Sequence, residues 1–139
     1  MKKKAPPRVP AYIWVLLVIL AGAIGYRVLS GRGASSHHPE PRAQVTADAV
    51  VAADRYAAEP DVARIYKLAA MIPEVLDGLH CYCECARNFD HRSLLTCFES
   101  DHGAACDICL REAEIAAQMT ADGRSLDEIR ARIDGLFRG

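Results

Sequence analysis

Apolar residues recur at helical spacing along most of the chain, and this pattern predicts a mainly helical protein. One uncharged apolar run lies near the N-terminus, at residues 11–26. Beyond it, the periodicity and the flanking capping residues predict helices over residues 47–58, 60–72, 74–79, 92–98, 107–119 and 126–137. No stretch alternates apolar and polar residues as a half-buried strand would, so the expected fold class is all-α.

Local signals predict several of the helix ends. Thr46 can cap the first helix of this series, and Pro60 suits the first position of the second. Ser125 and Glu128 form a capping box ahead of the last helix. That helix carries the clearest apolar stripe of the chain, made of Leu126, Ile129, Ile133, Leu136 and Phe137. We therefore expect a small helical bundle with an irregular cysteine-rich loop.

The apolar run predicts a single transmembrane anchor over residues 11–30. Tyr12, Trp14 and Tyr26 lie near its ends, where interfacial aromatic residues are common. Residues 1–10 form a basic tail, which the positive-inside rule assigns to the cytoplasm. A cleavable signal peptide is the alternative. Both interpretations put the remainder of the chain outside the cytoplasm.

Composition divides the chain beyond the anchor into two parts. Residues 31–45 are rich in Gly, Ser and Pro and predict a flexible linker, in which His37 and His38 would be solvated. Residues 46–139 then form the helical cysteine-rich domain. The first 33 residues carry six basic and no acidic side chains, which leaves 11 basic and 18 acidic groups for the rest. An acidic domain excludes nucleic acid as a partner and is compatible with cations.

All six cysteines lie in one window, from Cys81 to Cys109. Clustering of this kind indicates a local site, since a disulfide scaffold would spread its cysteines over the fold. Cys81, Cys83 and Cys85 alternate, so in an extended or looped segment all three thiols can face one centre. A disulfide within this run would have to close a tight ring, which we expect to be unfavourable.

The other cysteines and two histidines complete the candidate ligand set. Cys106 and Cys109 lie at the predicted start of a helix, where the helix dipole lowers the pKa of a thiol and favours the thiolate that binds metal. Cys97 lies on the short helix before them. His80 and His102 could add imidazole nitrogens, and His91 is a weaker candidate.

Thiolates select soft metal ions, chiefly Cu(I) and Zn(II). Six thiols exceed the four ligands of one structural zinc, so we expect Cu(I), with Zn(II) as the alternative. Three disulfides without metal are the competing interpretation, because the compartment is oxidising. Thiol–disulfide exchange through Cys106 and Cys109 is a third hypothesis. No carboxylate pair, Ser/His/Asp arrangement or phosphate loop indicates another enzyme, so we expect no catalytic function.

The run from His80 to Cys85, read His-Cys-Tyr-Cys-Glu-Cys, resembles the PCYCGC-motif family of small bacterial extracytoplasmic cysteine-rich proteins. The pair Cys97–Phe98 and the segment 102–109 continue the resemblance, which covers about residues 79–113. Two positions depart from the motif: His80 replaces the proline, and Glu84 replaces the glycine. Many family members are lipoproteins, but this chain has no lipidation cysteine after its apolar run. The resemblance implies an envelope location and a cysteine-based site, and it implies no reaction.

Together these observations predict a single-pass protein of the bacterial cytoplasmic membrane with its C-terminal domain in the periplasm or at the cell surface. Its expected function is to bind a soft metal for storage, resistance or delivery. The expected partners are the metal ion, the membrane and an envelope metalloprotein. The candidate metal ligands are Cys81, Cys83, Cys85, Cys97, Cys106, Cys109, His102 and His80.

Overall fold

The computed structural model describes residues 10, 12–14, 16, 18–20, 22 and 37–138. The chain divides into two units, residues 1–33 and 34–139, and each is described by itself. In the first unit the described residues from Tyr12 to Gly22 are helical, and most of their large apolar side chains are exposed.

Among the described residues, no helix is both long enough and apolar enough to cross a membrane. The anchor predicted over residues 11–30, the basic tail before it and the first part of the linker fall largely outside the described residues. Those assignments therefore stay predictions.

The second unit is built from helices and turns, and no strand occurs in the part of it that the structure describes, which confirms the all-α prediction. Its elements in chain order are η1 (Ala47–Ala49), η2 (Ala53–Tyr56), α2 (Pro60–Met71), α3 (Pro73–Asp77), α4 (Cys85–Asn88), α5 (Leu94–Phe98), η3 (Gly103–Ala105), α6 (Asp107–Ala121) and α7 (Leu126–Phe137). The η elements are short 3-10 helices.

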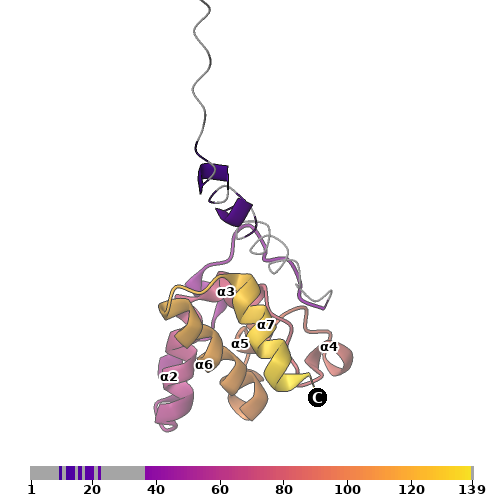
Figure 1. Ribbon diagram of the computed structural model, residues 1–139. Helices are drawn as coiled ribbons and strands as arrows, with labels where there is room; N and C mark the ends of the chain where they lie inside the picture. Colours follow the sequence, from indigo (N-terminus) through magenta and orange to yellow (C-terminus); the bar gives the residue numbers. More distant parts are fainter. Residues whose placement is uncertain are drawn as a thin grey trace, which may run out of the picture. The chain divides into compact units, whose positions relative to one another are not determined.

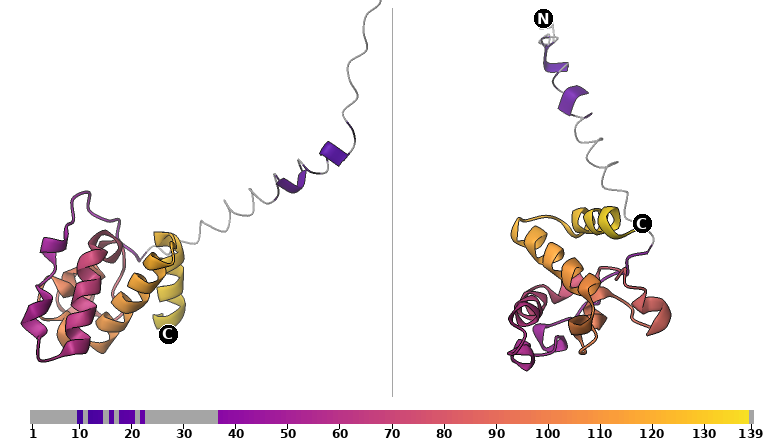
Figure 2. Two further views of the ribbon diagram at one scale, coloured as in Figure 1. Left: turned by 90° about the vertical axis from the view of Figure 1, so that its left-hand side faces the viewer. Right: turned by 90° about the horizontal axis from the view of Figure 1, so that it is seen from below.

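The helices α2, α6 and α7 form the scaffold of this unit. α2 packs along α6, and α7 lies against α6 in turn (Figures 1 and 2). Pro60 occupies the first turn of α2, and Ser125 and Glu128 form both hydrogen bonds of the capping box of α7, as the sequence predicts. Tyr66 of α2 and Ile129 of α7 are fully buried. The apolar stripes of these helices therefore supply much of the core.

The predicted helix over residues 47–58 is wrong. The segment forms only the two short turns η1 and η2, with an extended stretch between them. In that stretch the backbone N–H of Val51 donates to the carbonyl of Phe98 at 2.9 Å, and Val50 is buried. A tertiary hydrogen bond therefore replaces the helical one, which a propensity argument cannot anticipate.

Residues 37–45, the described part of the predicted linker, are held against the helices. The side chain of His38 is almost fully buried, and its Nε2 lies 2.9 Å from Asp134 Oδ1. Its Nδ1 accepts the backbone N–H of His80 at 2.9 Å. Val45 is also buried. The expectation that His38 is solvated is therefore wrong.

Asp77 anchors this segment. Its fully buried carboxylate accepts hydrogen bonds from the backbone and the guanidinium of Arg42 and from Ser93 Oγ, and it forms an ion pair with Arg92 at 2.9 Å. Burial alone would raise the pKa of Asp77, but the bonds from Arg42 and Ser93 outweigh it and the pKa is lowered.

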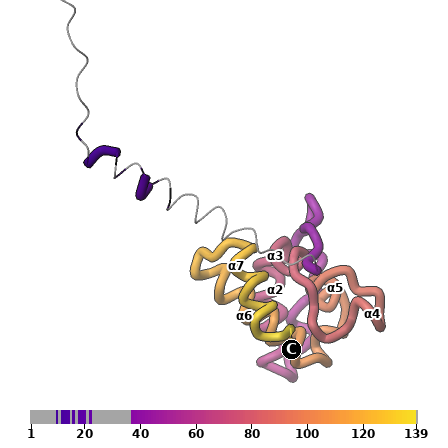
Figure 3. Tube along the Cα trace, turned by 45° about the vertical axis from the view of Figure 1, so that its right-hand side comes forward, coloured from indigo at the N-terminus to yellow at the C-terminus, as the bar shows by residue number. Residues whose placement is uncertain are grey.

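The turn at residues 81–84, which carries Cys81 and Cys83, and the following helix α4 lie at one edge of the unit, away from α2 (Figure 3). α5 continues from this turn toward the core, where Leu94, Leu95, Cys97 and Phe98 are fully buried. The fold thus places the cysteine window between an exposed edge and the helical core.

We expect Asp77→Ala to lower the free energy of unfolding by about 2 to 4 kcal/mol, because it leaves the two arginines without their shared buried partner. Urea denaturation measures this change. Asp54→Ala, at an exposed position, is the matched control and should change stability by less than about 0.5 kcal/mol. Equal stability of the two variants would contradict the anchoring role.

Candidate metal centre

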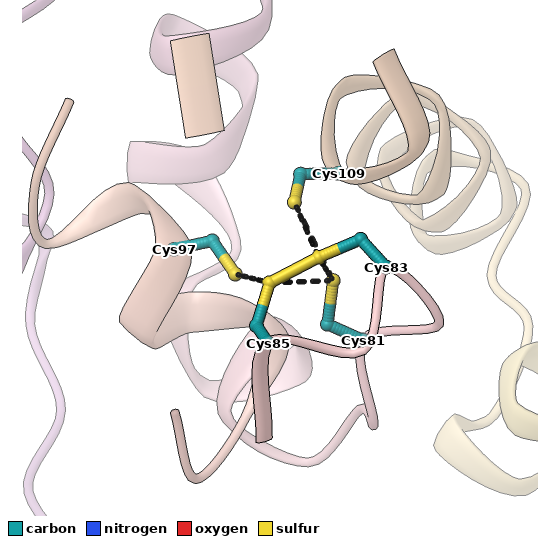
Figure 4. Close-up of side chains that lie close together, drawn as sticks. All are labelled: Cys81, Cys83, Cys85, Cys97 and Cys109. Carbon is teal, nitrogen blue, oxygen red and sulfur yellow. Dashed lines mark hydrogen bonds between the residues drawn. A yellow bond between two sulfur atoms is a disulfide. The ribbon is translucent and has the colours of Figure 1, made fainter. Parts of the chain in front are cut away.

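Five cysteine sulfurs meet in one place. The Sγ atoms of Cys81, Cys83, Cys85, Cys97 and Cys109 all lie within 4.8 Å of one another. They come from three segments: the turn before α4 with the first residue of that helix, then α5, and then the first turn of α6 (Figure 4). All but Cys83 are buried. The three cysteines of the CxCxC run share one centre, as their spacing predicts, and Cys97 and Cys109 join them.

The sulfur–sulfur distances are those of direct contact. Cys81 Sγ lies 3.3 Å from Cys83 Sγ and 3.4 Å from Cys109 Sγ. Cys109 lies 3.5 Å from Cys83, and Cys97 lies 3.6 Å from Cys85. One ion placed among them would need only small side-chain shifts to reach several thiolates, since thiolate–metal bonds are about 2.3 Å long.

The turn that brings the CxCxC sulfurs together depends on Glu84. This residue has φ 65°, in the left-handed region, and it precedes the first residue of α4. It occupies the position at which the PCYCGC motif has glycine, the residue that adopts this conformation without strain. A glycine would adopt this turn without strain, whereas this chain makes it with a residue that favours other conformations.

Cys83 and Cys85 are joined as a disulfide, whereas Cys81, Cys97, Cys106 and Cys109 are free thiols. The expectation that no bridge forms within the CxCxC run is wrong for this pair. The left-handed turn at Glu84 leaves the two Cα atoms 5.5 Å apart, within the range of about 4.4 to 6.8 Å that a disulfide spans.

The buried thiols hold their protons tightly. The hydrogen bond with Cys109 and burial raise the pKa of the Cys81 thiol. At Cys109 the hydrogen bond with Cys81 lowers the pKa, but the neighbouring Cys97 thiol and burial outweigh it, and the pKa is raised. The expectation of a lowered pKa is therefore wrong for Cys109, because the Cys97 thiol and burial together favour the protonated form. An arriving metal ion would have to displace these protons.

A buried carboxyl group borders the cluster. Glu112 of α6 is fully buried, and its Oε1 accepts the backbone N–H of Tyr82 at 2.9 Å. Its Oε2 is buried without a hydrogen-bond partner among the described residues. Burial raises the pKa of Glu112 to about 7, and the bond from Tyr82 and the nearby Cys81 thiol lower it only partly. Glu112 is not among the predicted site residues, and its only signal in the sequence is its place one turn after Cys109.

Two histidines reach the sulfurs. His102 Nε2 lies 3.1 Å from Cys85 Sγ, and His91 Nδ1 lies 3.3 Å from Cys97 Sγ. Together these four residues form a second group whose ligand atoms lie within 4.8 Å of one another. Burial, followed by the nearby His102, lowers the pKa of His91, so its ring is neutral at pH 7. His91 is the weaker candidate by sequence, because nothing in the spacing shows that its loop folds back onto α5.

His80 and Cys106 lie outside both groups. The His80 backbone N–H is bonded to His38, and its ring packs edge-on against Tyr82 with centroids 4.9 Å apart. Cys106 occupies the N-cap position of α6 without a capping hydrogen bond from its side chain. It precedes the first turn of the helix, which carries Cys109, and it is only half-buried. Of the eight residues predicted as ligands, the structure brings together five cysteines and His102.

The fold and the cluster define a class: a small all-helical protein with a buried group of cysteine sulfurs. A family model described as a protein of unknown function with PCYCGC motif matches residues 43–139. The chain therefore belongs to the PCYCGC-motif family, as the cysteine run predicts. The match extends far beyond residues 79–113 and takes in the whole helical scaffold. No curated protein and no solved structure matches the chain.

Glu112→Gln tests the buried carboxyl group. The pKa of Glu112 is about 7 in the folded protein and 4.5 in its ordinary state, so folding favours the protonated form. The stability that this preference contributes is complete below pH 4.5 and is lost as the pH rises through 7. Between pH 4.5 and pH 8 we therefore expect the free energy of unfolding to fall by about 1 to 3 kcal/mol more in the wild-type protein than in E112Q.

Urea denaturation of both proteins at the two pH values measures the difference. Glu114→Gln on the same helix, where the carboxylate is paired with Arg64 at the surface, is the matched control and should keep the wild-type pH dependence. An E112Q variant with that same dependence would contradict the shifted pKa.

Proposed function

We propose that this protein binds Cu(I) through the thiolates of Cys81, Cys83, Cys85, Cys97 and Cys109, and that it does so for storage, resistance or delivery of the metal. The single observation that carries the proposal is the convergence of these five sulfurs within 4.8 Å. Membership of a cysteine-rich family is consistent with it. The proposed role is binding and not catalysis.

The donor set favours a soft ion. Thiolates bind Cu(I) and Zn(II), but one tetrahedral zinc uses four ligands and would leave a buried fifth sulfur unused. Once the thiols have released their protons, burial also favours a bound cation. Several thiolates in a low-dielectric interior repel one another, so they need positive charge beside them. Copper(I) accepts two to four sulfurs and can share them between ions, which suits five sulfurs in contact. Zn(II) is the alternative occupant.

Metal binding of this kind requires the Cys83–Cys85 bond to be reduced. Two electrons and two protons, supplied by a dithiol that itself becomes a disulfide, break the S–S bond and yield two thiols. Each thiol then releases its proton when it binds copper. The proposed site is therefore open to metal only in its reduced form.

Thiol–disulfide exchange is the second candidate, and one observation favours it. Cys81 Sγ and Cys109 Sγ lie 3.3 and 3.5 Å from Cys83 Sγ, close to the distance from which a thiolate could attack the disulfide. Against it, both thiols are buried and their pKa values are raised, so the thiolate fraction at pH 7 is very small. A scaffold held by several disulfides has less support, because four of the six cysteines are free.

We also propose that the N-terminal segment anchors the domain to the bacterial cytoplasmic membrane, with the domain outside. The exposed apolar side chains of Tyr12, Trp14, Leu16, Val18, Ile19 and Leu20 support a lipid-facing role for this segment. The basic residues at positions 2–4 and 8 support a cytoplasmic N-terminus.

Cys109→Ser tests the metal proposal. Cys106→Ser is the matched control, because Cys106 lies three residues earlier and outside both groups of ligand atoms. After reduction, the wild-type protein and C106S should retain Cu(I) against a chromophoric Cu(I) chelator. C109S should lose at least about tenfold in affinity, because one thiolate of the cluster is gone. The absorbance of the chelator complex reports the copper that remains on the protein.

Equal copper retention by C109S and C106S would contradict the proposed ligand set. Retention by wild-type protein that has not been reduced, at the level of the reduced sample, would contradict the requirement for an open Cys83–Cys85 pair.

The anchor makes a separate prediction. In a bacterial host the full chain should stay in the membrane after an alkaline carbonate wash, and a variant lacking residues 1–30 should not enter the membrane fraction. Protease added to intact spheroplasts should digest the domain of the full chain. Release by the wash, or protection from protease until the cells are lysed, would contradict the proposed anchor and its orientation.

A further inference from the structure

A second group of metal-ligating atoms adjoins the five sulfurs and shares two of them. Cys85 and Cys97 belong to both groups, and His91 and His102 complete the second. The four ligand atoms lie within 4.8 Å of one another. Small movements of the side chains would bring all four within bonding distance of one tetrahedral ion.

The second group lies nearer the surface than the first. Cys85 and Cys97 are fully buried, whereas His91 and His102 are half-buried. The two imidazole rings lie edge to face with centroids 4.8 Å apart, and Phe89 packs against His102 at 4.8 Å. The Phe89 side chain is itself 61 % exposed. The histidines thus lie between the buried sulfurs and the solvent.

We propose that Cys85, Cys97, His91 and His102 form a second metal position, joined to the sulfur cluster through two bridging thiolates, that takes a soft to borderline d10 ion, Cu(I) or Zn(II). This inference rests on the proposed function, because the bridging thiolates are also ligands of the cluster. It goes further by assigning two imidazole ligands and a second ion to a defined place.

The chemistry of the donor set supports the assignment. Two thiolates and two imidazoles form the S₂N₂ set typical of a tetrahedral d10 ion. A thiolate has more than one lone pair, so the same sulfur can bind an ion on each side. A second cation would also offset the charge that several thiolates place in the interior.

The position explains how ions could pass between the cluster and a partner. The two imidazoles are its most exposed ligands, and they can be replaced by ligands of another protein without opening the core. Ions would therefore enter and leave through the histidine position, while the sulfurs of Cys81 and Cys109 hold the inner ion. Delivery to an envelope metalloprotein would use this edge of the domain.

The experiment compares two double variants of the reduced full chain. His91→Asn with His102→Asn removes the proposed imidazole ligands. His37→Asn with His80→Asn removes two histidines outside both groups and is the matched control. Native mass spectrometry counts the ions bound after titration with Cu(I) and, in a parallel arm, with Zn(II).

We expect the wild-type protein and the H37N/H80N variant to bind the same number of ions and the H91N/H102N variant to bind one fewer. The arm in which the loss appears identifies the ion. If H91N/H102N binds as many ions as the wild type in both arms, the second position is overturned while the sulfur cluster stands. If the wild-type protein binds no ion in either arm, the proposed function itself fails.

A measurement on the reduced wild-type protein removes any dependence on the folding of the variants. Cu(I) and Zn(II) are diamagnetic, so the ring nitrogens of His91 and His102 can be followed by NMR during the titration. A shift of both rings to metal-bound values as the second equivalent is added is expected. Unchanged ring signals at saturation would overturn the proposal.

Discussion

The site depends on the turn at Cys81–Cys85, because this turn must bring its sulfurs into contact with two different helices. Its sulfurs contact Cys97 of α5 and Cys109 of α6. The turn forms only because Glu84 accepts a left-handed backbone, at a cost of about 1 to 2 kcal/mol. The packing of α6 against α2 and α7 fixes the position of its first turn, which carries Cys109.

The same packing determines the protonation of the site. Hydrogen bonds among the thiols, together with burial, raise the pKa of Cys81, Cys97 and Cys109 and keep them protonated. Burial raises the pKa of Glu112 to about 7, so the cluster without metal carries little charge. Neutral groups can be buried at modest cost, but thiolates cannot. A cation that replaces these protons would reverse that balance. In the proposed function, reduction, proton release and metal binding would therefore be coupled.

Much of the scaffold could be predicted from the sequence, because its signals are local. Pro60 opens α2 and Ser125 with Glu128 caps α7, each through contacts within one turn of helix. The segment before α2 could not be predicted in this way. Val51 gives its N–H to Phe98, and Arg42 pairs with the buried Asp77, and both partners are distant in the sequence.

The site shows the same division. Alternate spacing was enough to predict that Cys81, Cys83 and Cys85 share a centre, and the family match agrees with that run. Spacing could not show that Cys109 joins the cluster while Cys106 does not. That outcome depends on where α6 begins: Cys106 precedes its first residue, and Cys109 lies in its first turn. It also could not rank His91 above His80, because the choice depends on how the loop after α4 folds onto α5.

X-ray absorption at the copper edge of the reduced, copper-loaded full chain is the sharpest test of the thiolate cluster. We expect sulfur to dominate the nearest neighbours of the copper, with a smaller imidazole contribution. We also expect the copper to be in the Cu(I) state. Copper surrounded only by oxygen or nitrogen, or lost from the reduced protein on buffer exchange, would contradict a thiolate cluster as the metal site.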